Sequence, residues 1–419
     1  MKSVWIINHY AIPPKFGGLN RHYYFSRYLG KQGYNIKIFT SSKIHNSSVN
    51  MIKPEDKRKF KIVDFDGVQY IFLKSSEYEG NGFSRIKNMI SFACFAYFFL
   101  KKEGIKRFGK PDLIYTSSPS LLASVSAVLL AKKIKIPVIT EIRDLWPESI
   151  VAYKNISRKN PIIILLYALE KWLYKCTDAL VFTTEGGKDY LKERGICDCI
   201  DLKKVYSLNN GVDLFDFEKN LSNKLNDDDL LRSDTFKIIY TGSIREVNDL
   251  SILLDVARSL KDTQRDVKFI VYGEGTQKDT LIKRCKAEGI DNICFKGHVS
   301  REFIPFILSK ANINIIIVKQ TDLTRFGTSY NKLFDYMASK KPIISNISVN
   351  YDLLQRYNCG VTSKSSGAED LKNAIKSIYN LPKAKYEELC RNAGEAAKDY
   401  DYKVLSAKLK KIIDSVAKV

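Results

Sequence analysis

The chain has 419 residues, of which 45% are hydrophobic and 27% charged, and this length provides for two domains of ordinary size, each with its own core. The 68 Lys and Arg against 46 Asp and Glu give a net charge of +22, so we expect an anionic partner. Because no zinc-finger spacing, RNA-binding aromatic signature or long basic tail accompanies this charge, nucleic acid is disfavoured and phosphorylated ligands on an anionic membrane surface are favoured.

The first half of the chain alternates between short apolar segments, typical of buried strands, and longer helical patterns. Such alternation favours a parallel sheet with helices on both faces. The Asp66-Gly67 pair predicts a hairpin turn. Strands are predicted at residues 4–8, 35–40, 113–116, 137–141, 179–183 and 205–208. Helices are predicted at residues 19–32, 84–108, 120–133, 161–176 and 185–193.

Two apolar segments of the first half have basic flanks. Residues 89–100 and 161–174 are too short to span a bilayer, which takes about 20 residues in a helix. Either segment is a helix of the core, or it lies in the membrane interface with its lysines at the lipid head groups. The sequence leaves both interpretations open.

A polar, acidic and Asn-rich stretch at residues 213–235 interrupts the pattern, as an exposed linker does. Beyond it, strands are predicted at residues 237–241, 268–272, 293–296, 313–318 and 342–345. Helices are predicted at residues 249–260, 277–288, 301–309, 331–339 and 368–379.

These elements predict an α/β protein with two Rossmann-like, doubly wound parallel-sheet domains that face a cleft. Ligands bind such sheets at the carboxyl ends of their strands. The predicted parts are residues 1–212, the linker at 213–235, residues 236–395, and a C-terminal helix at 396–419 that packs back on the first domain.

The segment that begins at Gly327 carries the clearest ligand-binding pattern. The backbone N–H groups of Gly327, Thr328 and Ser329 lie at the start of a predicted amphipathic helix, where they and the helix dipole attract anions. Lys332 supplies a cation for a phosphate, and Asp335 supplies a carboxylate that accepts hydrogen bonds from sugar hydroxyls. This combination predicts a nucleotide-sugar site; a surface helix with ordinary charges is the alternative.

Glycines at three predicted strand-to-helix turns let the backbone approach a phosphate closely. They are Gly17 and Gly18 in the first half, and Gly242 and Gly273 in the second. Next to Gly242, Ser243 is assigned to the same pocket, and Arg245 offers a planar guanidinium to a diphosphate. Ordinary structural turns are the alternative, and the absence of GxGxxG disfavours a dinucleotide.

No residue pattern predicts a metal ion or a bound cofactor. The eight cysteines are scattered, and the lone pair Cys197 and Cys199 matches neither a zinc site nor a thioredoxin motif. The first nine residues lack the apolar core and cleavage site of a signal peptide. We therefore expect a reduced, cytoplasmic protein.

Six motifs occur in the order found in one enzyme family. They are Gly17-Gly18, EIRDLWPE at residues 141–148, NGVD at 210–213, YTGSIR at 240–245, GEG at 273–275 and NKLFDYMA at 331–338. With them the chain resembles the retaining GT-B glycosyltransferases of family 4. It is most similar to the branch that assembles bacterial O-antigen or capsule repeats and includes fucosamine-type transferases.

The resemblance implies that the second half binds the donor. Arg245 and Lys332 would neutralise the departing nucleoside diphosphate, and Asp335 would bind ribose hydroxyls. Retention would proceed by attack on the front face, without an enzyme carboxylate as nucleophile. The chain departs from the family at Gly327, where many members carry Glu, and near Asn248, where the phosphate loop of the family carries Lys.

The resemblance also implies that the first half binds the acceptor. Gly17 and Gly18 would approach the donor phosphates. Asp144 would orient sugar hydroxyls and Arg143 would contact phosphate, with a buried ion pair at a loop as the alternative for both.

Together these inferences predict a hexosyl- or N-acetylhexosaminyltransferase. It would move a sugar from a nucleoside-diphosphate sugar, expected to be a UDP-sugar, onto a lipid-pyrophosphate-linked saccharide in surface-polysaccharide biosynthesis. We expect it at the cytoplasmic face of the cell membrane, held by anionic lipid and without a nucleic-acid partner. The alternatives are a sugar-nucleotide epimerase with the same architecture and a basic nucleic-acid-binding protein.

Overall fold

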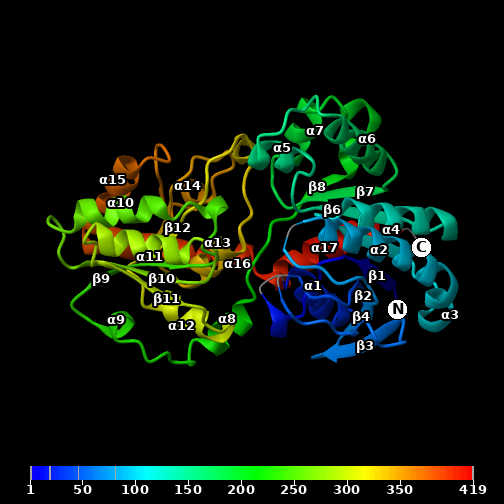
Figure 1. Cartoon of the computed structure of the whole chain (residues 1–419), viewed down its shortest axis with the longest axis horizontal. Coiled ribbons are helices and arrows are strands. Elements are labelled where there is room, and N and C mark those ends of the chain that lie inside the picture. The colour runs from blue at the N-terminus through cyan, green and yellow to red at the C-terminus, as the bar shows by residue number, and fades with distance from the viewer. Residues whose placement is uncertain (1, 18–19, 46, 81, 418–419) are drawn as a thin grey trace. The chain divides into compact units, whose positions relative to one another are not determined.

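The computed structural model describes residues 2–17, 20–45, 47–80 and 82–417 (Figure 1). They form two compact units. The first comprises Met1–Asn209 and Tyr402–Val419, and the second comprises Asn210–Asp401. The C-terminal segment therefore belongs to the first unit.

The first unit is built on an eight-stranded sheet with the order β3-β4-β2-β1-β5-β6-β7-β8. All neighbouring strands are parallel except β3 and β4, which form the hairpin predicted at Asp66-Gly67. Both turn residues have positive φ, 52° at Asp66 and 82° at Gly67. The strands are β1 (Ser3–Ile7), β2 (Asn35–Ser41), β3 (Phe60–Phe65), β4 (Val68–Leu73), β5 (Leu113–Ser117), β6 (Val138–Ile142), β7 (Ala179–Phe182) and β8 (Val205–Ser207).

Helices cover both faces of this sheet because successive strand residues point to opposite sides. Val4 and Ile6 pack with α1 and α17 in one core cluster, whereas Trp5 lies beside Gly104 under the helices of the other face. The helix predicted at residues 84–108 is interrupted by a π-helical turn, η2 (Leu100–Gly104). The α-helices are α1 (Arg21–Gly30), α2 (Phe83–Phe99), α3 (Ile105–Phe108), α4 (Leu121–Ile134), α5 (Glu148–Lys154), α6 (Pro161–Lys175), α7 (Gly187–Glu193) and α17 (Tyr402–Val416).

The second unit contains a six-stranded, fully parallel sheet with the order β11-β10-β9-β12-β13-β14. Two core clusters occupy its two faces. Its strands are β9 (Phe236–Thr241), β10 (Val267–Tyr272), β11 (Ile293–Gly297), β12 (Ile313–Ile316), β13 (Ile343–Ser345) and β14 (Gly360–Thr362). Its α-helices are α8 (Leu214–Asn220), α9 (Asp228–Leu231), α10 (Ser251–Leu260), α11 (Lys278–Ala287), α12 (Ile304–Ser309), α13 (Asn331–Ala338), α14 (Leu353–Tyr357), α15 (Ala368–Tyr379) and α16 (Lys383–Asp399).

The prediction of two α/β units with parallel sheets is confirmed. The stretch at 213–235 differs from the predicted exposed linker, because it forms α8 and α9 and packs into the second unit. Phe217 and Leu230 are buried in its core, and Asp213 and Asp227 cap the two helices. The polar composition concealed this role, since two apolar anchors are enough to dock two short helices.

None of the described helices combines the length and the apolar character needed to cross a membrane.

Candidate active site

The loops after β9, β10 and β11 pack backbone against backbone. Gly242 N donates to Tyr272 O at 3.0 Å, and Gly273 N donates to Gly297 O at 2.8 Å. A Cβ placed on Gly273 would lie 1.8 Å from Gly242 O, and one on Gly275 would lie 2.2 Å from the carbonyl oxygen of the β9 loop. Gly273 is therefore needed for this packing as well as for its φ of 156°. Its predicted contact with substrate stays a prediction.

Lys332, in the first turn of α13, lies against the β9 loop. Its Nζ donates to Tyr240 Oη at 2.9 Å and lies 4.2 Å from the centroid of the Tyr240 ring. A Cβ on Gly242 would be 3.1 Å from the same Nζ, so the ammonium lies close to this glycine. Burial lowers the pKa of Lys332 from 10.5 to about 7. Among the described residues no carboxylate pairs with this ammonium, which leaves it available to an anion.

The start of α13 offers donors next to that ammonium. Tyr330, the N-cap residue, provides no side-chain cap, and only Leu333 N closes the first turn, by donating to Tyr330 O at 3.1 Å. The N–H groups of Asn331 and Lys332 have no acceptor within the described part of the chain. Free N–H groups at a helix start and an unpaired cation are together suited to a phosphate.

Asp335 follows one turn further along α13. Its side chain is 15% exposed and lies 3.6 Å from the guanidinium of Arg301. Burial raises the pKa of Asp335, while the charge of Arg301 opposes that rise. Arg301 begins the short 3₁₀ turn Arg301–Phe303 after β11. The sequence did not indicate its pairing with Asp335, because the two residues are far apart along the chain.

The loop before α13 places its three predicted residues differently. Gly327 has φ +83°, a conformation that favours glycine. Thr328 is half-buried. The Ser329 Oγ accepts from Asn210 N at 2.7 Å, and the Ser329 carbonyl accepts from Asn210 Nδ2 at 2.6 Å. The predicted contact of the Ser329 backbone N–H with an anion stays a prediction. Ser329 thus anchors the segment at which the second unit begins.

Arg245 and Ser243 belong to the β9 loop. Asn248 holds this loop, because its Nδ2 donates to Ser243 O at 2.6 Å and to Ser243 Oγ at 2.9 Å. Arg245 precedes the short 3₁₀ turn Glu246–Asn248, and its side chain is exposed. The structure therefore brings the Lys332 ammonium close to Gly242 and leaves Arg245 exposed to solvent.

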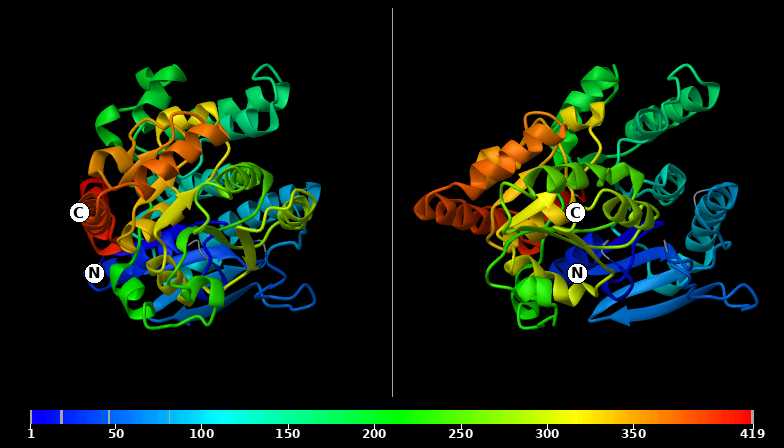
Figure 2. Two further views of the ribbon diagram at one scale, coloured as in Figure 1. Left: turned by 90° about the vertical axis from the view of Figure 1, so that its left-hand side faces the viewer. Right: turned by 60° about the vertical axis from the view of Figure 1, so that its left-hand side comes forward.

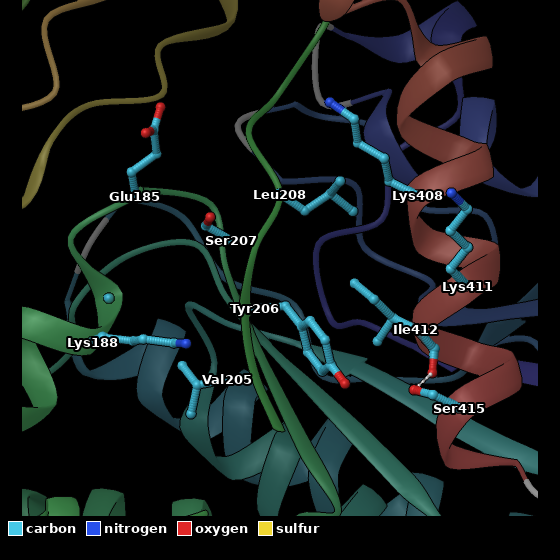
Figure 3. Close-up of a pocket in the computed structure, with 11 residues that line it drawn as sticks. Glu185, Lys188, Val205, Tyr206, Ser207, Leu208, Lys408, Lys411, Ile412 and Ser415 are labelled. Carbon is cyan, nitrogen blue, oxygen red and sulfur yellow. Dashed lines mark hydrogen bonds between the residues drawn. The ribbon is translucent and has the colours of Figure 1, made fainter. Parts of the chain in front are cut away.

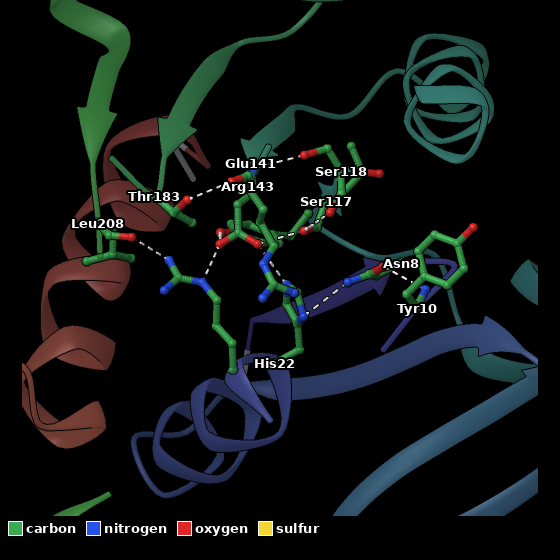
Figure 4. Close-up of polar contacts among 12 residues, drawn as sticks. Asn8, Tyr10, His22, Ser117, Ser118, Glu141, Arg143, Thr183 and Leu208 are labelled. Carbon is green, nitrogen blue, oxygen red and sulfur yellow. Dashed lines mark hydrogen bonds and ion pairs between the residues drawn. The ribbon is translucent and has the colours of Figure 1, made fainter. Parts of the chain in front are cut away.

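In the first unit, a buried carboxylate lies at the end of β6 (Figure 4). Glu141 Oε1 accepts from Arg21 Nε and Tyr115 Oη, both at 2.6 Å. Its Oε2 accepts from Ser117 Oγ at 2.7 Å and from His22 Nε2 at 3.0 Å. Burial opposes the charged form, but Arg21 and His22 hold the pKa of Glu141 well below its ordinary value. The sequence placed Glu141 in a motif without giving it these partners.

The same network fixes the tautomer of His22 and extends to the segment after β8. Asn8 Nδ2 lies 3.2 Å from His22 Nδ1, and an amide nitrogen only donates, so Nε2 carries the proton that His22 donates to Glu141. Burial lowers the pKa of His22, which favours the neutral form of the ring. Arg21 also donates to Leu208 O at 2.7 Å. The network therefore holds together β1, α1, β5, β6 and the segment after β8.

Arg143 and Asp144 follow β6 in a loop held by Ser118 and Thr183. Arg143 N donates to Ser118 Oγ at 2.8 Å, and Arg143 O accepts from Thr183 Oγ1 at 3.2 Å (Figure 4). Arg143 is half-buried and Asp144 exposed. No ion pair joins these two described side chains, so the loop does not contain the buried Arg143–Asp144 ion pair that was the alternative. Their roles toward a sugar and a phosphate stay predictions.

The two glycines predicted to bind phosphate in the first unit are Gly17 and Gly18. Gly17 has φ 161°, an extended conformation open to any residue, and a Cβ there would meet only Ile12 at an ordinary 3.8 Å. Nothing in the packing of the described residues requires a glycine at this position. Gly18 lies outside the described residues.

A hollow of about 650 Å³ lies in the first unit between α7, β8 and α17 (Figure 3). Lys188, Lys408 and Lys411 line it around Tyr206. None of the residues predicted from the sequence to bind substrate lines this hollow. The described residues also include no group of three or more His, Cys, Asp or Glu side chains arranged to hold a metal ion.

Two families match the chain in tandem. Residues 16–215 match the family described as Glycosyltransferase Family 4, and residues 222–400 match Glycosyl transferases group 1. A curated relative, EpsD of Bacillus subtilis strain 168, is a proposed glycosyltransferase that is 22% identical over 236 residues. That match spans 55% of this chain and 58% of EpsD.

Solved structures with the same fold extend over the whole chain. Sucrose-phosphate synthase from Thermosynechococcus elongatus has a TM-score of 0.75 at 15% identity and covers 99% of each chain. HepE from Anabaena, solved in complex with UDP, has a TM-score of 0.69 at 12% identity and covers 99% of this chain and 100% of HepE. In fold and in both family matches, the chain is similar to glycosyltransferases of the GT-B class. Its N-terminal region is of the family 4 type, and its C-terminal region is of the group 1 type.

Proposed function

We propose that the chain transfers a hexosyl or N-acetylhexosaminyl group from a UDP-sugar to a lipid-linked saccharide, with retention of the anomeric configuration. The observation that carries the proposal is the Lys332 ammonium. It is held by Tyr240 beside Gly242, lacks a carboxylate partner among the described residues, and adjoins free N–H groups at the start of α13. A diphosphate supplies the anion that this arrangement lacks.

The proposed chemistry uses the same groups. As the bond between the anomeric carbon and the diphosphate oxygen breaks, its electron pair leaves with the diphosphate, and Lys332 and the helix start stabilise the new charge. The acceptor hydroxyl oxygen bonds to the anomeric carbon on the same face, and its proton passes to the departing diphosphate. Asp335 would hold the ribose hydroxyls, and the exposed Arg245 would fold over the diphosphate.

The proposal needs no carboxylate nucleophile. Glu141, the deeply buried carboxylate of the first unit, already accepts from four side chains. It is therefore committed to structure and is not free to attack a sugar. Arg143, Asp144, Gly17 and Gly18 remain the candidates for contacts with the acceptor and the donor phosphates.

Acceptor and location follow from charge. The net charge of +22 favours an acceptor with a pyrophosphate and a site at an anionic membrane. We therefore place the protein at the cytoplasmic face of the cell membrane, acting on a lipid-pyrophosphate-linked saccharide in surface-polysaccharide biosynthesis.

Two measurements test the proposal. A thermal-shift screen with UDP, GDP, ADP and their sugars is expected to show the largest stabilisation with UDP compounds, because a ligand of the folded state raises its apparent stability. Radiolabelled UDP-sugars are then offered with and without lipid-linked acceptors. Transfer only in the presence of acceptor supports the proposal, whereas a new sugar nucleotide formed without acceptor would show an epimerase instead.

A further inference from the structure

The outward surfaces of α2, α4 and α6 in the first unit are apolar. These helices form one layer, since α4 packs against both α2 and α6, and Figures 1 and 2 show the layer from three directions. Eight of the sixteen exposed large hydrophobic side chains among the described residues lie on it. The eight, which we call the apolar face, are Phe83, Ile86, Ile90, Phe98, Leu129, Ile162, Ile164 and Leu165.

Beyond its first turns, from Met89 to Phe99, the helix α2 is apolar on nearly all sides. Phe92 and Phe99 point into the core and are at most 4% exposed, whereas Ile86, Ile90 and Phe98 follow a spacing of four along the outer side and are 49–60% exposed. A helix that is hydrophobic all round is normally covered on all sides. The described part of this chain covers only the inner side, so the outer side calls for a partner.

A groove of about 230 Å³ runs between α2 and α4 within the apolar face. Its exposed lining is entirely apolar. Such a groove accepts a hydrocarbon chain, whereas a phosphate or a sugar placed there would lose its hydrogen bonds with water. The lining residues are Ile90, Ala93, Cys94, Tyr97, Phe98, Leu122, Val125, Ser126 and Leu129.

Cations surround the apolar face. Between residues 83 and 108 there is one acidic residue, Glu103, against six basic ones. Lys101 Nζ lies 5.6 Å from the ring of Tyr97 beside the groove, and Lys132 Nζ lies 5.8 Å from the ring of Trp172. Lysines beside amphipathic aromatic rings are typical of helices in the interface of a bilayer, where the ammonium reaches the head groups. The charge complements anionic lipid.

We propose that the first unit docks on a bilayer containing anionic phospholipid through the apolar face, with α2 lying in the interface and a lipid hydrocarbon chain entering the groove between α2 and α4. The inner sides of the two apolar segments are then core, and their outer sides contact lipid. The inference deepens the proposed function, which rests on a lipid-linked acceptor. The docking surface lies in the first unit and the donor site in the second, so the two fail independently.

Vesicle flotation of the full chain tests the docking. We expect binding to phosphatidylcholine vesicles that contain phosphatidylglycerol, and weaker binding to pure phosphatidylcholine or at high salt. The double substitution Phe98→Glu and Leu165→Glu should lower the vesicle-binding constant by about 100-fold, because the burial of both apolar side chains in lipid is lost. The matched control is Phe215→Glu on α8, because Phe215 is 63% exposed and Phe98 is 60% exposed.

A probe at Cys94 tests the groove. Cys94 is exposed within it, so an environment-sensitive fluorophore attached to the thiols should shift to the blue on anionic vesicles, and a Cys94→Ser variant identifies the share from this site. Equal flotation of the double variant and the wild type would overturn the inference. So would a dimer in solution that the double variant disrupts while vesicles bind neither protein, since a second copy would then cover the face. UDP binding that persists in either case would leave the proposed donor site intact.

Discussion

Each unit holds a charged side chain next to the carboxyl ends of its strands, fully buried Glu141 in the first unit and half-buried Lys332 in the second, and the two charges are treated in opposite ways. Glu141 in the first unit accepts hydrogen bonds from Arg21, His22, Tyr115 and Ser117. Lys332 in the second unit has Tyr240 as its polar side-chain partner and no carboxylate among the described residues. The first charge has a full set of partners and the second does not.

The pKa values record this difference. Arg21 and His22 hold the pKa of Glu141 well below its ordinary value in spite of burial, so the folded protein stabilises the charge. Burial lowers the pKa of Lys332 to about 7, so the folded protein disfavours that charge until an anion arrives. A buried charge with complete partners belongs to the architecture, and one without them indicates where a ligand binds.

The largest expected effect is on stability, at Glu141. The Glu141→Ala variant leaves Arg21 buried without its counterion, and breaking a buried pair in this way costs about 3–5 kcal/mol of unfolding free energy. Urea denaturation measures it, with the exposed Glu79→Ala as control. A cost equal to that of the control would show that the network is not structural.

The corresponding change in the second unit should act on binding. Lys332→Met removes a charged donor from the diphosphate and should weaken UDP binding by about 100-fold, or about 3 kcal/mol. The stability of the free protein should hold or rise, because a poorly paired buried charge is gone. Calorimetric titration with UDP checks the first point and urea denaturation the second. Lys286→Met removes an exposed lysine and serves as control; an equal loss of affinity there would contradict the site.

A pH series sharpens the comparison further. Since Lys332 titrates near pH 7 in the free protein and a diphosphate favours its charged form, UDP binding takes up a proton above pH 7. The binding constant for UDP should therefore decrease with rising pH between pH 7 and pH 9, by up to about tenfold per pH unit. The Lys332→Met variant should lose this pH dependence. Without UDP, Lys332 binds more protons in the unfolded state than in the folded state between pH 7 and its ordinary pKa of 10.5. The free energy of unfolding should therefore rise with pH in that window. Titrations in buffers of different ionisation enthalpy count the protons taken up.

The smallest expected effect is at Arg245. Its side chain is exposed, so Arg245→Gln should change the unfolding free energy by less than about 0.5 kcal/mol. UDP affinity should fall by about threefold to tenfold, the range of a charge that closes over a ligand from solvent. The exposed Arg265→Gln is the control, and a loss as large as that of Lys332→Met would mean that Arg245, not Lys332, carries the diphosphate.

The sequence predicted much of the architecture and some of the site. Alternating apolar segments predicted the parallel sheets, and Asp66-Gly67 predicted the hairpin, because both signals are local. Local composition also misled at 213–235, where Phe217 and Leu230 dock a stretch expected to be exposed. The sequence suggested Lys332 as a phosphate-binding residue because it lies in the first turn of a predicted helix. The sequence did not indicate the hydrogen bonds between Ser329 and Asn210, because the two residues are 119 positions apart.

By itself the sequence determined the fold class, the glycine loops at the strand ends, the excess of positive charge and the placing of Lys332 and Asp335 on one helix start, because periodicity, turn chemistry and charge are properties of neighbouring residues. The tertiary structure alone decided which charges are satisfied. Arg21, His22, Tyr115 and Ser117 meet Glu141 only because α1, β5 and β6 converge, and Tyr240 meets Lys332 only because β9 ends beside α13. The partners of a buried charge are set by which loops the sheet brings to one edge, and no spacing along the chain records that.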